Sequence, residues 1–140
     1  MADRLENHIG GQWVASKASA VHEVMNPATA EVIAECPLGT AADLDDAVRA
    51  AKEAFPAWRK LPPVERVQYL FKLKFLLEEH AEELAEIVTQ ENGKTLAESR
   101  GSVRRGIQMV EMAIGAPSLL MGQVLEDVGS GVDCESIRQP

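Results

Sequence analysis

The sequence predicts an α/β chain that is rich in helices and opens with short strands. Three observations support this prediction. Short apolar runs separated by turn-forming residues fill positions 8–36. Apolar residues then recur at helical spacing over most of positions 40–114, and a Gly-Ser-Gly turn at 129–131 precedes one more strand-like run at 132–138. Periodicity therefore changes twice along the chain, from strand to helix and back.

The strand-rich start is expected to contain a hairpin. Val24 and Ile33 lie on either side of a turn-like segment, residues 26–30 with the sequence N-P-A-T-A. Proline fixes φ in such a turn and asparagine bonds its own backbone. The two flanking runs should therefore pair with each other.

The first helix should begin at Thr40, a suitable N-cap, with Asp43 three residues later as an approximate capping box. One apolar stripe follows at 4-3-4-3 spacing: Leu44, Val48, Ala51, Phe55 and Trp58. Pro56 lacks a backbone N–H and crowds the preceding turn, so it should kink or end this helix.

A second, long helix is predicted from about residue 63 to about residue 91, because Pro63 suits a first helical turn. Residues 67–77 are apolar on most sides, which predicts a central, buried position. The glutamates between 78 and 86 are typical of a solvated face. Gly93 suits the C-terminal end of the helix.

The third helix has the sharpest pattern. Thr95 with Glu98 forms a second capping box, and Gly115 starts the segment that should end the helix. A narrow apolar stripe joins these ends: Leu96, Val103, Ile107, Val110 and Ile114. The strand-like run at 132–138 has no later partner in the sequence, so we expect unpaired backbone groups and an interruption within a domain.

Composition excludes several classes of protein. The 140 residues include 46% hydrophobic residues, enough for one packed domain, and the net charge of −8 argues against a nucleic-acid partner. No apolar run has the length of a membrane span, and no secretory signal is visible after Met1. We therefore expect a cytoplasmic protein with two reduced cysteines.

Most candidate chemical motifs fail on spacing. Gly93 and Lys94 resemble the end of a phosphate-binding loop, but Val88 stands where the earlier glycine is required. No G-x-G-x-x-G fingerprint occurs. The remaining candidates have simpler structural interpretations, and no catalytic, cofactor-binding or metal-ligating residue is predicted among them: His8, His22, His80, Cys36, Cys134, Glu91 and Glu98.

Arg104 and Arg105 lie off the apolar stripe of the third helix, and Arg105 is nearly opposite to it. Both could be ordinary solvated arginines. Alternatively they form an anion site, because a guanidinium offers a rigid fork of donors to a carboxylate. Gly101 and Gly106 flank the pair, and glycine within a helix predicts a close approach of another backbone.

Four runs, in order, resemble the aldehyde dehydrogenase superfamily. They are residues 9–13 (I-G-G-Q-W), 26–33 (N-P-A-T-A-E-V-I), 54–58 (A-F-P-A-W) and 91–95 (E-N-G-K-T). Each is weak alone, but together they are specific and spread over most of the chain. The resemblance implies an NAD-dependent enzyme with a covalent cysteine mechanism.

A narrower resemblance is carried by residues 104–111 (R-R-G-I-Q-M-V-E) and 115–122 (G-A-P-S-L-L-M-G). These are similar to the CoA-acylating methylmalonate-semialdehyde (malonate-semialdehyde) dehydrogenases, which convert a semialdehyde to an acyl-CoA with release of CO2. In that branch the arginine before Gly-Ile holds the substrate carboxylate. The resemblance therefore implies a substrate-binding role for Arg105, with NAD as cofactor and CoA as co-substrate.

The resemblance also implies a domain organisation. Residues 1–122 would be the helix-rich, incomplete N-terminal part of an NAD-binding domain, and residues 123–140 would supply the first strand of an oligomerisation arm. The parent enzyme would form homo-oligomers through this strand, and the chain alone would be inactive. Two alternatives remain open: a semialdehyde dehydrogenase that hydrolyses its thioester without CoA, and a non-enzymatic helical adaptor or regulatory module.

Overall fold

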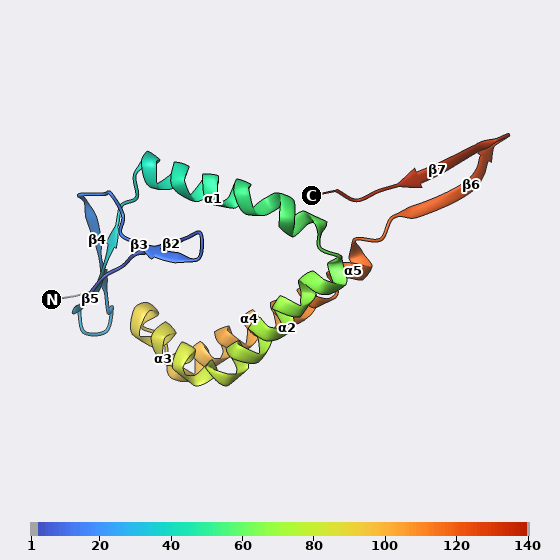
Figure 1. The fold of residues 1–140 in the computed structure, drawn as a ribbon. Helices are drawn as coiled ribbons and strands as arrows, with labels where there is room; N and C mark the ends of the chain where they lie inside the picture. The colour runs from blue at the N-terminus through green and yellow to red at the C-terminus, as the bar shows by residue number, and fades with distance from the viewer. Residues whose placement is uncertain (1–2, 140) are drawn as a thin grey trace.

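A computed structural model describes residues 3–139 as a group of helices between N-terminal strands and a C-terminal hairpin (Figure 1). The α/β prediction is confirmed. The strands are β1 Asp3–Arg4, β2 Asn7–Ile9, β3 Gln12–Val14, β4 Val21–Met25, β5 Val32–Pro37, β6 Gln123–Gly129 and β7 Val132–Ser136. The helices are α1 Ala41–Lys60, α2 Pro63–Glu79, α3 Ala81–Asn92, α4 Leu96–Ile114 and α5 Ala116–Leu119.

The N-terminal strands form two small sheets. One has the order β1-β5-β4, in which β1 is parallel and β4 antiparallel to β5. The predicted hairpin is confirmed: the Asn26 side-chain oxygen accepts the Ala28 N–H at 2.9 Å and closes the turn between β4 and β5. The second sheet is the β2–β3 hairpin, in which Gly10 and Gly11 have φ values of 60° and 80°. Glycine tolerates this left-handed region without steric cost.

Helix α1 begins with the predicted capping box. Thr40 accepts the Asp43 N–H at 3.2 Å, and the Asp43 carboxylate accepts the Thr40 N–H at 2.8 Å. The helix does not end at Pro56 but continues to Lys60. Leu61 then turns the chain into α2, which starts at Pro63 as expected.

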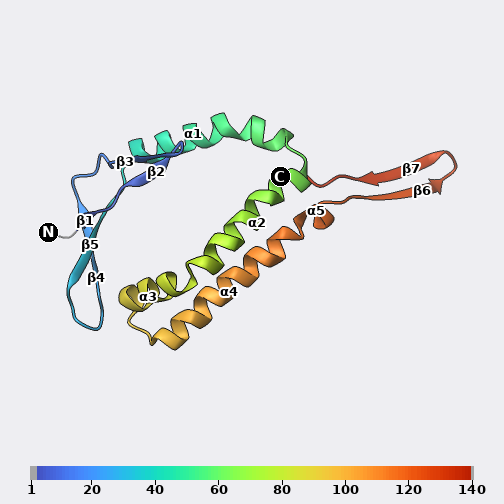
Figure 2. The ribbon, with the colours of Figure 1, turned by 60° about the horizontal axis from the view of Figure 1, so that its bottom comes forward.

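The single long helix predicted for residues 63–91 is wrong. The chain breaks at His80, whose φ and ψ are −100° and 17°, and α3 sets out from there in a new direction (Figure 2). No glycine or proline marks the break, since none occurs between residues 64 and 92. Packing supplies the reason, because the bend lets both α2 and α3 lie against α4.

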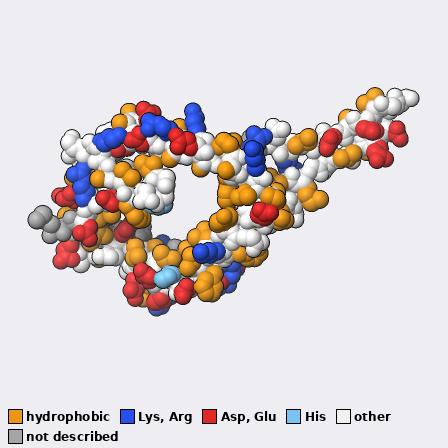
Figure 3. Space-filling model, in the orientation of Figure 1, with side chains coloured by type: hydrophobic (Ala, Val, Ile, Leu, Met, Phe, Trp, Pro, Cys, Tyr) orange, Lys and Arg blue, Asp and Glu red, His pale blue; other side chains and the backbone are white. Residues whose placement is uncertain are grey.

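Most of the buried residues lie where α2, α3 and α4 meet, and Ala18 and Asp43 are also buried near the start of α1. Ala85 and Ser99 are fully buried and Ile107 is 5% exposed, while Val67 is the buried residue of α2. The predicted central burial of residues 67–77 is therefore wrong for this chain, in which Phe75 is 64% exposed. Figure 3 shows hydrophobic side chains around an open space between α1 and the α2–α4 pair. No described element covers those side chains, which is the physical reason for their exposure.

Strands β6 and β7 form an antiparallel hairpin that projects from the helices (Figures 1 and 2). The expectation of an unpartnered strand at 132–138 is therefore corrected, since β6 supplies the partner. Every residue of the two strands is exposed. At the foot of the hairpin Gly122 approaches the Ser136 carbonyl oxygen so closely that any Cβ there would collide with it. Glycine is required at this position.

Candidate functional site

Helix α4 carries the predicted substrate-binding residue, and its start is rigidly fixed. Gly93 ends α3 with φ of 77°, and a Cβ at this position would lie 2.7 Å from Cγ of Pro27. Thr95 and Glu98 then form the predicted capping box. The Thr95 hydroxyl and N–H donate to the Glu98 carboxylate at 2.9 and 3.1 Å, which lowers the pKa of Glu98. Glu98 therefore serves as a helix cap.

Arg105 lies in the middle of α4 and is exposed. Within residues 3–139 its guanidinium forms no ion pair and no hydrogen bond, although carboxylates are numerous in the chain. Its neighbours one turn away carry no charge: Gly101, Ser102, Gln108 and Met109. The geometry therefore leaves all of its donors available for an anion, and the substrate-binding role stays a prediction.

Arg104 has different surroundings. It lines a cavity of about 320 Å³ between α2, α3 and α4 together with Glu82 and Arg100. Arg100 donates to the Glu82 carboxylate from Nε at 2.9 Å and from Nη2 at 2.5 Å, and this pairing lowers the pKa of Glu82. Arg104 therefore shares a cavity with the Glu82 carboxylate, whereas Arg105 does not line this cavity.

The prediction that Gly101 and Gly106 mark a close backbone approach is wrong within the described chain. A Cβ built on either glycine meets no atom within 4 Å. The face of α4 that carries them is open because no described element crosses it. Met109 and Met112 lie on the same exposed side and are 59% and 69% exposed. This face therefore has both an unpaired guanidinium and an uncovered apolar surface.

The histidines and cysteines do not gather into a site. His8 packs against Trp13 with ring centroids 4.9 Å apart and ring planes tilted by 60°, and Nδ1 of His80 lies 2.9 Å from the Glu83 carboxylate. Cys36 and Cys134 are free and exposed on separate strands. Between Asp3 and Gln139 no group of three or more His, Cys, Asp or Glu side chains could hold a metal ion.

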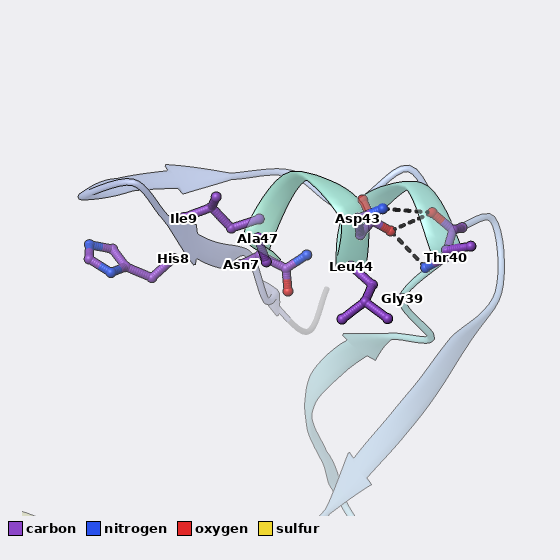
Figure 4. A pocket seen from close by; sticks show the side chains of 9 residues that line it. Asn7, His8, Ile9, Gly39, Thr40, Asp43, Leu44 and Ala47 are labelled. Atoms are coloured by element: carbon purple, nitrogen blue, oxygen red, sulfur yellow. Dashed lines mark hydrogen bonds between the residues drawn. The ribbon is translucent and has the colours of Figure 1, made fainter. Parts of the chain in front are cut away.

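A cavity of about 460 Å³ lies beside the start of α1 (Figure 4). Its one carboxylate, Asp43, is 8% exposed and accepts hydrogen bonds from Ser16, the Lys17 N–H and Thr40 at 2.8–3.0 Å. The Thr40 and Lys17 N–H groups hold its pKa far below the usual value. The capping box was predicted from sequence, whereas the bonds to Ser16 and Lys17 were not. The Asp43 carboxylate links the strand segment to α1. Because it already accepts four hydrogen bonds, we assign it a structural role and not a catalytic one.

The described residues do not fit a dinucleotide. Pyrophosphate binds at helix N-termini whose backbone N–H groups are open. Here carboxylates of Asp43 and Glu98 already occupy the starts of α1 and α4. Helix α2 begins with proline, which removes a donor, and α3 has Glu82 and Glu83 in its first turn.

No helix within residues 3–139 is long and apolar enough to cross a membrane.

Comparison with known proteins gives consistent matches. The family model described as "Aldehyde dehydrogenase family" matches residues 13–140. The chain is 52% identical over 136 residues to malonate-semialdehyde dehydrogenase 2 of Geobacillus kaustophilus, covering 97% of this chain and 28% of that protein. It is 50% identical to malonate-semialdehyde dehydrogenase 1 of the same organism, with the same coverage. The chain thus spans 28% of the length of these curated relatives.

Solved structures give the same result. A candidate methylmalonate-semialdehyde dehydrogenase of Sinorhizobium meliloti 1021, solved with NAD, superimposes with a TM-score of 0.94 and 38% identity. The methylmalonate-semialdehyde dehydrogenase of Oceanimonas doudoroffii has a TM-score of 0.91 and 38% identity. Both matches cover 100% of this chain and 28% of the other chain. The strands, the broken helix and the projecting hairpin therefore match the fold of one part of a larger protein.

Proposed function

The chain belongs to the aldehyde dehydrogenase family, and on that premise we propose that it is the N-terminal portion of an NAD-dependent, CoA-acylating methylmalonate- or malonate-semialdehyde dehydrogenase. The observation that carries the proposal is Arg105, an exposed guanidinium without a partner on an open face of α4. The 52% identity to a malonate-semialdehyde dehydrogenase supports the substrate class, since such substrates carry a carboxylate beside the aldehyde.

Residues 1–122 form the leading part of the NAD-binding domain in this proposal, and residues 123–140 begin the oligomerisation arm. The β6–β7 hairpin supports the division, because it leaves the helices at Gly122 and packs against none of them. Isolated two-stranded hairpins are marginally stable in water, so this one gains stability from a partner. We assign that role to another copy of the enzyme, which makes the protein a homo-oligomer.

Arg105 recognises the substrate carboxylate by a bidentate pair of hydrogen bonds. Guanidinium geometry matches a carboxylate better than a lysine ammonium does. The uncharged neighbours on α4 offer no competing acceptor of full charge. Met109 and Met112 beside it provide an apolar surface which, once covered, excludes water from the ion pair and strengthens it.

The remaining chemistry is assigned to the part of the protein outside this chain. NAD, when bound there, accepts the hydride of the aldehyde. The described residues contribute the substrate-positioning arginine and the scaffold, so the 140-residue chain alone should be inactive. NADH formation from malonate semialdehyde, NAD and CoA measures this, and turnover above the protein-free control would contradict it.

Arg105→Ala in the full-length enzyme tests the carboxylate role. The value of kcat/KM for methylmalonate semialdehyde should fall roughly 10- to 100-fold, the range expected for losing a hydrogen bond to a charged group. Arg105→Lys should lose less, because it keeps the charge without the fork. Propanal has no carboxylate, so its kcat/KM should be nearly unchanged in both variants.

Arg104→Ala is the matched control, since Arg104 lines the cavity between α2, α3 and α4 and Arg105 does not. An equal fall for both substrates in Arg105→Ala would make Arg105 a structural residue. No change for either substrate would make it an ordinary surface arginine.

Product analysis tests the CoA branch of the proposal. Acyl-CoA should form in proportion to NADH, with CO2 released from the substrate carboxylate. A free acid formed at the same rate with and without CoA would instead identify an enzyme that hydrolyses its thioester.

A further inference from the structure

A second basic site lies at the foot of the β6–β7 hairpin, away from Arg105. A cavity of about 400 Å³ opens there where three segments of the chain meet. Arg59 reaches it from the end of α1, Arg66 from the start of α2, and Arg138 from the segment after β7. Figure 3 shows blue side chains at this junction of the helices and the hairpin.

The charge of this cavity is unusual for the molecule. Its lining residues include three arginines and no acidic residue, in a chain with 22 acidic and 14 basic residues. The cavity between α2, α3 and α4 provides the contrast, since there Arg100 is paired with Glu82. Three guanidiniums that share one cavity without a counter-charge repel one another. A bound anion would remove that repulsion.

The arginines are also positioned with donors to spare. Nε of Arg66 is buried and has no acceptor among the described residues. Nε of Arg138 donates to the Met121 carbonyl at 3.2 Å, which fixes that side chain while leaving its terminal nitrogens available. Pro63, the first residue of α2, lines the same cavity and brings the positive end of that helix dipole close to it. Nearly all buried polar groups in proteins have a partner, and the Arg66 nitrogen is an exception among the described residues.

We propose that Arg59, Arg66 and Arg138 form a binding site for a phosphate group. A phosphate carries about two negative charges and three strong acceptor oxygens, which matches three guanidiniums better than a carboxylate with one charge and two oxygens. The group is either free inorganic phosphate or the phosphate of a larger ligand such as CoA. The chemistry of recognition is the same for both.

Binding of inorganic phosphate to the full-length protein tests the proposal. The binding is monitored by the width of the phosphate 31P NMR line, with the ionic strength held constant by chloride. Saturable broadening is expected for the wild type. Arg59→Ala and Arg138→Ala alter exposed side chains and should each weaken the affinity roughly 10-fold. Arg66→Ala should weaken it at least as much. Arg49→Ala is the matched control, because Arg49 is an exposed arginine of α1 that pairs with Asp46, and it should bind as the wild type does.

Competition identifies the source of the phosphate. Displacement of inorganic phosphate by CoA at lower concentration assigns the site to the co-substrate, and failure of CoA to displace it assigns the site to free phosphate. The proposal is overturned if the wild type shows no saturable broadening, or if Arg59→Ala and Arg138→Ala bind phosphate as tightly as Arg49→Ala does. Arg105→Ala should leave phosphate binding unchanged, so this result is independent of the proposed semialdehyde role.

Discussion

The helices α2–α4 and the hairpin β6–β7 make opposite use of apolar residues. In the helical body Val67, Ala85 and Ile107 are buried where α3 and α2 lie on α4. In the hairpin the apolar side chains of Val124, Leu125 and others are all exposed. The helical body therefore buries apolar side chains by its own contacts, whereas the hairpin buries none of its side chains among the described residues.

The largest difference should appear when one apolar residue in each region is truncated. Ile107→Ala should reduce the free energy of unfolding by about 2–5 kcal/mol, the usual cost of removing a buried branched side chain. Leu125→Ala should change it by no more than about 0.5 kcal/mol, because Leu125 is 64% exposed. Urea unfolding of the 140-residue chain measures both. Equal losses would mean that the hairpin folds onto the helices in solution.

Acid should weaken the junction between the strands and α1. The pKa of Asp43 is held below its usual value by the Thr40 and Lys17 N–H groups. Its contribution to stability is therefore complete above the unfolded-state pKa, about 3.9, and is lost as the pH falls further towards the folded pKa. Asp43→Asn should lower stability at pH 7, and its difference from wild type should shrink at pH 3.

Asp45→Asn provides the control for this series, because Asp45 is an exposed carboxylate two residues away on the same helix. Urea unfolding at pH 7, 5 and 3 is the measurement. A difference between Asp43→Asn and wild type that is the same at pH 3 as at pH 7 would show that the carboxylate charge is irrelevant to the junction.

The smallest change in the free energy of unfolding is expected for a substitution in the hairpin that reduces self-association of the chain. The isolated chain should self-associate, because exposed apolar side chains line both the hairpin and the helices. Leu125→Lys should leave the urea midpoint unchanged while lowering the average mass seen by light scattering at several concentrations. Ala42→Lys, an exposed site on α1, is the control for added charge. A wild-type chain that is a compact monomer at every concentration, with a sharp melt, would contradict this prediction.

Local signals in the sequence predicted the ends of elements well. The capping boxes at Thr40 and Thr95, the left-handed Gly93 and the turn after Asn26 all depend on bonds between residues a few positions apart. The break at His80 could not be predicted, because no glycine or proline marks it and the packing of α2 and α3 on α4 involves residues distant in sequence.

The candidate site likewise has one part that local spacing predicts and another that depends on residues distant in sequence. Helical spacing placed Arg105 away from the apolar stripe, and it is exposed as that spacing implies. The cluster of Arg59, Arg66 and Arg138 joins residues up to 79 positions apart, and no spacing rule brings them together. The close backbone approach predicted at Gly101 and Gly106 is absent among the described residues. Helix periodicity shows which residues share a face, but it does not show which element packs on that face.

Gly122 has a mechanical consequence. The hairpin begins directly after Gly122. The seven residues of β6, at about 3.4 Å each, place the tip of the hairpin roughly 24 Å from its base. A side chain at Gly122 would collide with the Ser136 carbonyl oxygen at the base of the hairpin and tilt the strands. A tilt of about 10° there would carry the tip about 4 Å, farther than the length of a hydrogen bond. The absence of a side chain at Gly122 thus influences where the far end of the hairpin lies.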